Sequence, residues 1–213
     1  MLTIWGRATS SNVQKAMWAV GELGLPHERI DVGGPHGGLD TPEFAVLNPN
    51  RTIPTLDDDG LIVWESNAIV SYLCTRYGAG TLYPDDWPGR AAAEQWMDWM
   101  QATFYRDWID LFWGLVRTAP SKHDTAANAA MATRCGERLQ ILDAQLAKHP
   151  YVTGEALTMG DIPIGSTLYR YFTMEIERPN LPNVEAYYAR LRDRPAYQVH
   201  VMVSYESLRV TEG

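Results

Sequence analysis

Residues 49–73 decide the fold: PNRTIPTLDDDGLIVWESNAIVSYL, in which the first proline is Pro49. Pro54 stands at the entrance of a strand-like run, between the β-branched residues Ile53 and Thr55. Because proline cannot donate to a strand ladder, it is normally confined to sheet edges and bulges. We therefore expect an edge here, with a cis bond before Pro54 as one way to leave the backbone N–H and C=O of Ile53 unpaired.

The pair Glu65–Ser66 lies between the apolar run 61–64 and the helical pattern that continues to Leu73. An acid and a hydroxyl thus stand at a strand-to-helix junction, where the free N–H groups of a first helical turn favour an anion. The region offers a strand edge for an extended peptide, an acid for an ammonium group and a helix N-terminus for a carboxylate.

The turn 53–56 and the segment 65–73, in this order, resemble the glutathione-binding half of the cytosolic glutathione S-transferase family. The resemblance is to bacterial members of the serine-type theta or delta-like kind, or to an asparagine-containing relative. It implies a detoxifying transferase that activates the thiolate of bound glutathione for attack on an electrophilic, partly apolar small molecule. Glutathione-dependent reduction of disulfides or peroxides, and a non-catalytic glutathione-binding scaffold of the same fold, stay open as alternatives.

Composition limits the class of protein. The chain of 213 residues is 46% hydrophobic and 21% charged, which is typical of a globular protein. Its net charge of −8 argues against nucleic acid or an anionic membrane as the main partner, and no apolar run is long enough to span a bilayer. Cys74 and Cys135 form no metal-binding spacing and are expected to be buried thiols. We expect a cytoplasmic protein without a signal peptide, with glutathione as co-substrate and no metal.

Periodicity divides the chain into two domains of different class, α/β and all-α. The order β-α-β-α-β-β-α in the first part is that of a thioredoxin-like domain, placed at 1–78, and a linker then leads to an all-helical bundle domain at 88–213. The expected strands are 2–5, 27–32, 54–56 and 61–64, and the expected helices are 11–23, 41–47, 67–77, 90–118, 125–148, 162–174, 181–192 and 195–203.

The loop before the first helix should hold the group that activates the thiol. It contains no tyrosine and no cysteine but has Ser10, Ser11 and Asn12. Ser11 has Gln14 three residues later, a capping-box spacing, so we expect Ser11 to cap the helix and Ser10 to face the substrate. The resemblance also points to Ser10 through its distance from Gly24. Asn12, whose amide can donate to a thiolate, is the second candidate, and Thr9 or Ser11 are the remaining ones.

The resemblance assigns further residues to the binding site. Glu65 is expected to hold the γ-glutamyl ammonium, Ser66 its carboxylate, and Ile53 the extended peptide backbone. Arg51 or, less favoured, His36 would meet the glycyl carboxylate. Tyr105 and Trp108, from an aromatic-rich helix whose apolar residues exceed one face, are expected to line the second-substrate pocket, and the same excess, with the resemblance, predicts a homodimer. The complete set of expected glutathione-binding residues is Arg51, Thr52, Ile53, Pro54, Glu65, Ser66 and Asn67.

Overall fold

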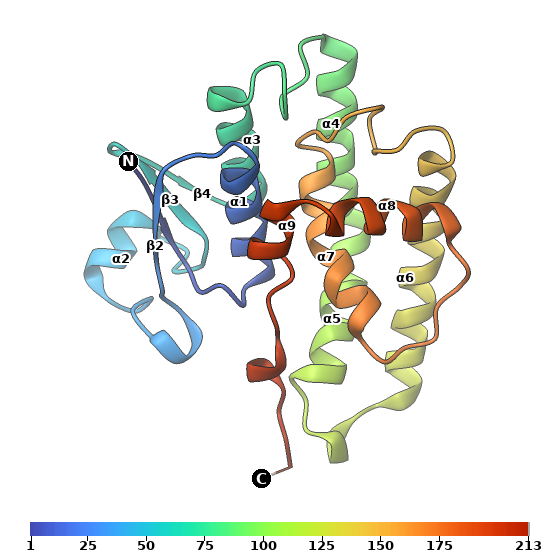
Figure 1. Cartoon of the computed structure of the whole chain (residues 1–213). Coiled ribbons are helices and arrows are strands. Elements are labelled where there is room, and N and C mark those ends of the chain that lie inside the picture. Colours follow the sequence, from blue (N-terminus) through green and yellow to red (C-terminus); the bar gives the residue numbers. More distant parts are fainter. Residues whose placement is uncertain (213) are drawn as a thin grey trace.

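A four-stranded mixed sheet organises the N-terminal part of the computed structural model, which describes residues 1–212 (Figure 1). The strand order is β2-β1-β3-β4, with β1 parallel to β2 and the other two pairs antiparallel. The register places Ile4 opposite Leu56, and both side chains are fully buried. The strands are β1 (Leu2–Trp5), β2 (His27–Ile30), β3 (Thr55–Asp58) and β4 (Leu61–Trp64).

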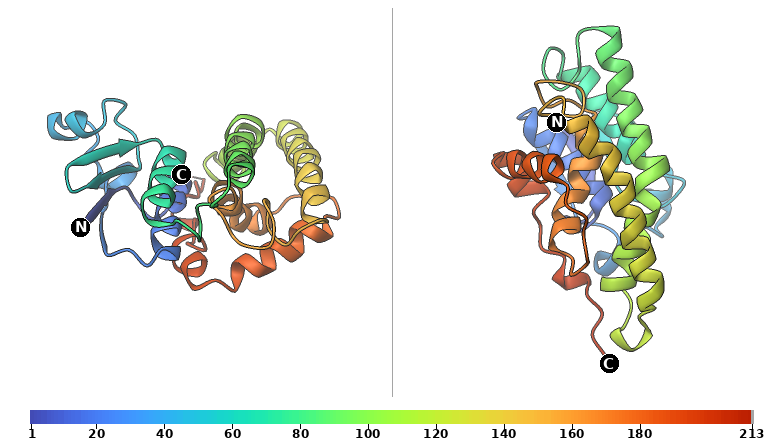
Figure 2. Two further views of the ribbon diagram at one scale, coloured as in Figure 1. Left: turned by 90° about the horizontal axis from the view of Figure 1, so that it is seen from above. Right: turned by 90° about the vertical axis from the view of Figure 1, so that its right-hand side faces the viewer.

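Three helices accompany the sheet: α1 (Ser11–Glu22), α2 (Pro42–Leu47) and α3 (Ser66–Tyr77). α1 packs along α3, and these two helices lie between the sheet and the helical part. α2 lies away from the helical part (Figures 1 and 2). α2 begins as expected, because Thr41 accepts a hydrogen bond from the Phe44 N–H at 3.2 Å. The predicted order of strands and helices is confirmed.

The second part is helical, as predicted, and contains α4 to α9. In place of the single helix expected at 90–118, the structure has two helices joined by a π-helical turn. The first of them begins three residues earlier than expected, with Asp86 as an N-cap that accepts from the Gly89 N–H, and the π-helical turn lies at Met100–Phe104. The helices are α4 (Trp87–Trp99), α5 (Tyr105–Val116), α6 (Thr125–Leu146), α7 (Asp161–Thr173), α8 (Pro182–Arg192) and α9 (Pro195–His200).

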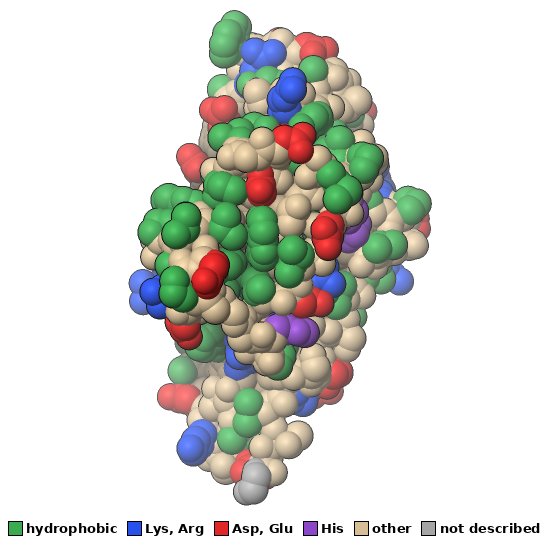
Figure 3. Space-filling view, turned by 90° about the vertical axis from the view of Figure 1, so that its left-hand side faces the viewer, with side chains coloured by type: hydrophobic (Ala, Val, Ile, Leu, Met, Phe, Trp, Pro, Cys, Tyr) green, Lys and Arg blue, Asp and Glu red, His purple; other side chains and the backbone are tan. Residues whose placement is uncertain are grey.

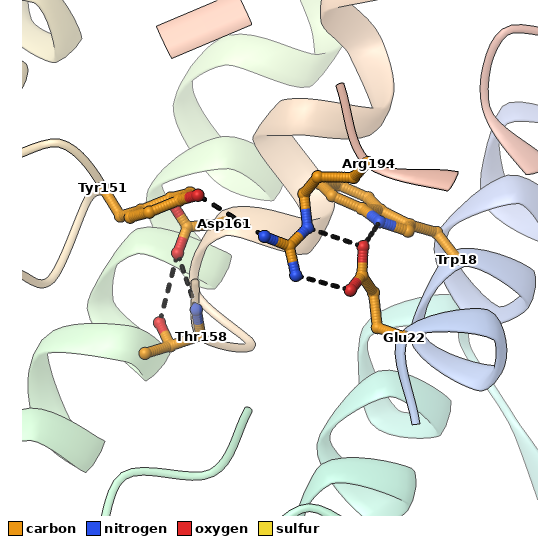
Figure 4. Close-up of polar contacts among 6 residues, drawn as sticks. All are labelled: Trp18, Glu22, Tyr151, Thr158, Asp161 and Arg194. Carbon is orange, nitrogen blue, oxygen red and sulfur yellow. Dashed lines mark hydrogen bonds and ion pairs between the residues drawn. The ribbon is translucent and has the colours of Figure 1, made fainter. Parts of the chain in front are cut away.

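The two parts share buried contacts centred on α1, which packs on both α7 and α9. The Trp18 ring meets Tyr197 of α9 edge to face, with centroids 4.9 Å apart. At the end of α1, Glu22 accepts from Trp18 Nε1 and forms a bidentate ion pair with Arg194, at 2.8 and 2.6 Å (Figure 4). α1 is therefore fixed from both sides, and its N-terminus has a defined position. The exact boundary at 78/88 stays a prediction.

Three buried groups have pKa values that burial explains. Asp161 at the start of α7 accepts from the N–H groups of Val152 and Thr158 and from the Tyr187 hydroxyl (Figure 4 shows the Thr158 contact), and its burial raises the pKa to about 6. Cys74 and Cys135 are buried free thiols, as expected, and burial raises the pKa of each to about 12.

Within residues 1–212 no helix is both long and apolar enough to cross a bilayer.

Candidate active site

The Ile53–Pro54 peptide bond is cis, as the sequence led us to expect. The loop before it is held by the buried Asn48, whose Nδ2 donates to the Thr52 carbonyl at 2.9 Å and to the Thr55 hydroxyl at 3.1 Å. The expected sheet edge is wrong, because β3 lies between β1 and β4 and is an internal strand. Pro54 is tolerated because β3 starts only at Thr55, and the Ile53 backbone, just before the strand, makes no hydrogen bond with the rest of residues 1–212. Its N–H and C=O are therefore free to pair with an extended ligand.

Ile53 also lies next to the turn that leads from β1 to α1. At Gly6, where φ is +150°, a Cβ would stand 2.4 Å from Val13 Cγ2 and 3.3 Å from the Ile53 Cβ. Only glycine permits this approach. The absence of a side chain at Gly6 thus brings the backbone of Ile53 close to the loop that carries the candidate catalytic residues.

Helix α3 begins at Ser66, one residue earlier than predicted. Glu65 occupies the N-cap position with a φ of +69°, makes no side-chain cap and is exposed. No acidic residue lies in the first turn of α3. The helix N-terminus consequently presents its free N–H groups beside an exposed carboxylate, which suits a ligand that carries both an ammonium group and a carboxylate.

The Ser66 hydroxyl lies 3.3 Å from Asn12 Oδ1, so the first turns of α3 and α1 are in contact. Because Oδ1 accepts this hydrogen bond, the Asn12 Nδ2 is left as a donor, and no bond from it occurs within residues 1–212. Two residues that the sequence separates by 54 positions are thus brought together. Ser66 is buried, and Asn12 is half-buried.

The prediction that Ser11 caps α1 is wrong. Ser10 has the extended dihedrals of an N-cap (φ −86°, ψ 122°), and Ser11 is already helical. Gln14, expected to complete a capping box, instead donates from Nε2 to the Ala8 carbonyl at 3.0 Å. Neither serine hydroxyl has a partner within the described chain, and Ser11 is the more deeply buried of the two. Both hydroxyls are available as donors.

Arg170 of α7 fixes the same loop from the helical part. Its guanidinium donates to the Thr9 carbonyl at 2.7 Å and lies 4.5 Å over the Phe112 ring. The side chain is almost fully buried, which lowers the pKa of Arg170 to about 10. No local sequence pattern indicates this contact, since 161 residues separate the two partners.

Lys15 is a further residue that sequence reasoning missed. It is fully buried on α1, and its Nζ lies 3.4 Å from Ser66 Oγ, 3.4 Å from Asn67 Oδ1 and 3.3 Å from Gln101 Oε1. Burial lowers its pKa to about 7. One signal was present: a lysine placed among Val13, Ala16 and Met17, on the apolar side of a helix.

The remaining predicted residues lie as follows. Asn67 donates to the Met97 carbonyl at 3.2 Å and so contacts the helical part. Arg51 and His36 are exposed, and Arg51 lies 3.7 Å from Asp40 in a solvated ion pair. Tyr105 is half-buried with Lys15 Nζ 5.1 Å above its ring, whereas Trp108 has no exposed surface and could reach a substrate only if its neighbours moved.

Comparison with known proteins agrees with this architecture. Residues 9–76 match the family described as glutathione S-transferase, N-terminal domain, and residues 109–195 match glutathione S-transferase, C-terminal domain. The chain is 40% identical over 205 residues to the glutathione S-transferase GstB of Escherichia coli K12, covering 95% of this chain and 99% of that one.

Solved structures give the same result. A theta class glutathione S-transferase from the citrus canker pathogen Xanthomonas axonopodis pv. citri, determined with glutathione bound, superposes with a TM-score of 0.92 at 52% identity, covering 95% of this chain and 98% of that chain. The Bombyx mori glutathione transferase BmGSTD1 superposes at 0.86 with 26% identity, covering 97% and 95%. The fold is thus that of a two-domain enzyme with a thioredoxin-like first domain. The chain belongs to the cytosolic glutathione S-transferase family.

Proposed function

We propose that this protein is a transferase that binds glutathione between the unpaired backbone of Ile53 and the N-termini of α1 and α3, and uses its thiolate against an electrophilic, partly apolar small molecule. The observation that carries the proposal is the contact between Asn12 and Ser66, which joins the two helix N-termini beside the free backbone of Ile53. The glutathione-bound relative at 52% identity supports the choice of ligand.

The γ-glutamyl end is assigned to α3. The exposed Glu65 carboxylate pairs with the ligand's ammonium group, and the N–H groups of the first turn, together with the Ser66 hydroxyl, receive its carboxylate. Asn67 stays near this end through its contact with Met97. A charge-assisted hydrogen bond contributes about 1.5–3 kcal/mol, so this end supplies much of the affinity.

The cysteinyl residue pairs with the backbone of Ile53 as an added strand, which is a general mode of peptide recognition. The adjoining Thr52 and Pro54 shape this loop. The glycyl carboxylate then extends towards Arg51, which must leave its weak ion pair with Asp40 to reach it. His36 in the neighbouring turn is the alternative cation.

The thiol is placed at the N-terminus of α1. A free thiol titrates near pH ~8.5, and lowering its pKa by ~2 units takes about 2.7 kcal/mol of preferential thiolate stabilisation. The unpartnered Ser10 hydroxyl and the helix N–H groups could supply that, with Ser10 as the donor and Asn12 Nδ2 as the second candidate. Because Ser11 is not the cap, it is a third donor to be tested.

The chemical step is a nucleophilic attack. The thiolate sulfur forms a bond to an electrophilic carbon, and the leaving group departs with the electron pair of its broken bond. Tyr105, half-buried on α5, and Trp108 behind it are assigned to the apolar side of the second substrate. Glutathione-dependent disulfide or peroxide reduction is the second candidate, favoured by the free amide donor of Asn12.

A homodimer and a cytoplasmic, detoxifying role complete the proposal. Hydrophobic side chains gather on the face of the molecule that the sheet-bearing part presents in Figure 3. In that part Val46, Leu61 and Trp64 are 85%, 49% and 40% exposed. A contiguous apolar patch on one face is typical of an interface, and a second copy of this chain is the occupant that the family favours.

Activity and binding assays test the proposal. Turnover is measured with chloro-2,4-dinitrobenzene, with hydroxyethyl disulfide and with cumene hydroperoxide, each with glutathione, and binding is measured by calorimetry. Transfer to the aromatic electrophile as the main activity supports the transferase, whereas disulfide or peroxide turnover without it supports the reductase. Glutathione binding without any turnover would support the scaffold.

A further inference from the structure

Lys15 is a buried cation without an anionic partner. Its side chain has no exposed surface, and within residues 1–212 it forms no ion pair. Its hydrogen-bond partners Ser66, Asn67 and Gln101 are all neutral, and Nζ also lies 5.1 Å from the centroid of the Tyr105 ring. An isolated charge in such surroundings is costly and is normally found only where a partner compensates it.

The position of Lys15 indicates where that partner comes from. Ser66 and Asn67 are the first two residues of α3, so the ammonium lies directly behind the helix N-terminus that receives a carboxylate in the proposed function. The third partner, Gln101, belongs to the π-helical turn between α4 and α5. Such turns are frequent at functional sites, and here the turn brings an amide oxygen to the cation.

The charge balance around Lys15 is simple. The Glu65 carboxylate favours the ammonium form of Lys15 and raises its pKa, against the larger effect of burial. Tyr105 of α5 contributes its ring face rather than its hydroxyl. The other titratable groups on the helices packed against α1 make no hydrogen bond or ion pair with Lys15 within residues 1–212; these are Tyr72, Cys74, Arg76 and Tyr77 on α3, Asp161, Tyr169, Arg170 and Tyr171 on α7, and Tyr197 and His200 on α9.

We propose that Lys15 is the positioning cation of the glutathione site, which holds Ser66 and Asn67 from behind and takes up a proton when the γ-glutamyl carboxylate arrives at the N-terminus of α3. The inference rests on the proposed function. Glu65 and Lys15 then match the two charges of the γ-glutamyl end, one in front of the helix terminus and one behind it.

The sign of the linkage follows from the burial of the amine. In the free protein the pKa of Lys15 is lowered to about 7, so at pH 8 the amine is mainly neutral. A carboxylate bound nearby favours the ammonium form and raises this pKa. Binding therefore draws in a proton at pH 8, and the contribution of Lys15 to affinity is constant below pH ~7 and falls as the pH rises from there to the raised pKa of the complex.

The test uses S-methylglutathione, whose blocked thiol cannot contribute protons. Calorimetric titrations at pH 8 in two buffers of different ionisation enthalpy give the number of protons taken up. On binding, the wild type should take up as much as about one proton more than Lys15→Met. The proton uptake of Lys15→Met itself measures the contribution of the ligand amine. Lys15→Met should bind roughly ten- to a hundredfold more weakly.

Two further variants separate positioning from folding. Lys15→Arg keeps a cation that does not titrate, so it should bind S-methylglutathione with affinity near that of wild type but without the extra proton. Lys148→Met, which removes an exposed lysine far from the site, should behave as wild type in both measurements. If Lys15→Arg does not fold, the difference in proton uptake between the wild type and Lys15→Met still tests the role of Lys15.

The outcomes distinguish the two proposals. Failure of the wild type to bind S-methylglutathione overturns the proposed function and this inference together. Binding by the wild type with no more proton uptake than Lys15→Met overturns the inference alone, even if that variant binds weakly, because a merely structural lysine would give that result. Unchanged affinity in Lys15→Met also overturns it.

Discussion

The hydroxyl of Ser66 donates to Oδ1 of Asn12 across 3.3 Å, and this contact joins the N-termini of α3 and α1. Each terminus carries free N–H groups and thus partial positive charge. The carboxylate and the thiolate of one extended tripeptide therefore have neighbouring positions to occupy. The contact also orients the Asn12 amide, so that removal of Ser66 would affect both ends of the site.

Removal of the Glu65 carboxylate should weaken glutathione binding. Glu65→Ala deletes the partner assigned to the γ-glutamyl ammonium, and we expect a loss of affinity of roughly ten- to a hundredfold, measured calorimetrically. Glu137→Ala, which removes an exposed acid on α6, is the matched control and should bind as wild type. Equal affinities for both variants would disprove the assignment.

The thiolate donor can be identified by ultraviolet absorbance of bound glutathione against pH. If Ser10 donates, Ser10→Ala should raise the thiol pKa and slow turnover at neutral pH by roughly ten- to a hundredfold, with affinity near wild type. The loss should shrink at high pH, where the thiol ionises unaided. Ser11→Ala and Asn12→Ala are measured beside it. A shift confined to Asn12→Ala would transfer the role to Asn12 and favour the reductase, and a shift confined to Ser11→Ala would assign it to Ser11.

Lys15 should reduce stability while it serves binding. Its folded-state pKa, about 7, lies below the unfolded value near 10.5, so folding is penalised fully below pH ~7 and the penalty fades as the pH rises from 7 to 10.5. Lys15→Met removes this penalty on folding. We expect that variant to be more stable by about 1–3 kcal/mol at pH 6.5, measured by denaturant unfolding, with a smaller gain at pH 9.5. A variant less stable than wild type at pH 6.5 would contradict this.

The ion pair between Glu22 and Arg194 should stabilise the junction of the two parts. The pair is bidentate, and the Glu22 side chain is only 9% exposed. Arg194→Met should therefore lower the free energy of unfolding by about 1–3 kcal/mol. Arg209→Met breaks a solvated pair with Glu206 instead and should change stability by less than about 1 kcal/mol. Similar losses in both variants would show that burial does not set the difference.

The proposed dimer can be tested at its apolar surface. The wild type should sediment as a dimer at micromolar concentration, and Trp64→Glu should shift it towards monomer, because a buried unpaired charge at an interface is costly. Val199→Glu alters an apolar residue of α9 that is 66% exposed, on the other part of the molecule, and should leave the dimer intact. A wild-type monomer would refute the prediction.

Local sequence signals determined the order of the elements. Alternation predicted β2, apolar runs predicted β1 and β4, Thr41 and Pro42 predicted the start of α2, and Pro54 indicated a cis bond, although the sheet edge expected there is wrong because β3 is an internal strand. These signals are local because capping, turn chemistry and proline geometry act within a few residues. A second local inference also failed, since Gln14 hydrogen-bonds to Ala8 rather than completing a capping box with Ser11.

Only the tertiary structure decided what surrounds the site. Lys15 meets Ser66, 51 residues away, and Gln101, 86 residues away, and Arg170 reaches Thr9 across 161 residues. No local pattern specifies such pairs, because they arise from the packing of α1 against α3 and the helical part. The sequence by itself determined the family and the residues at the two helix N-termini. Packing decided that one buried lysine lies behind them, because burial depends on the elements that close around a residue and not on its neighbours in the chain.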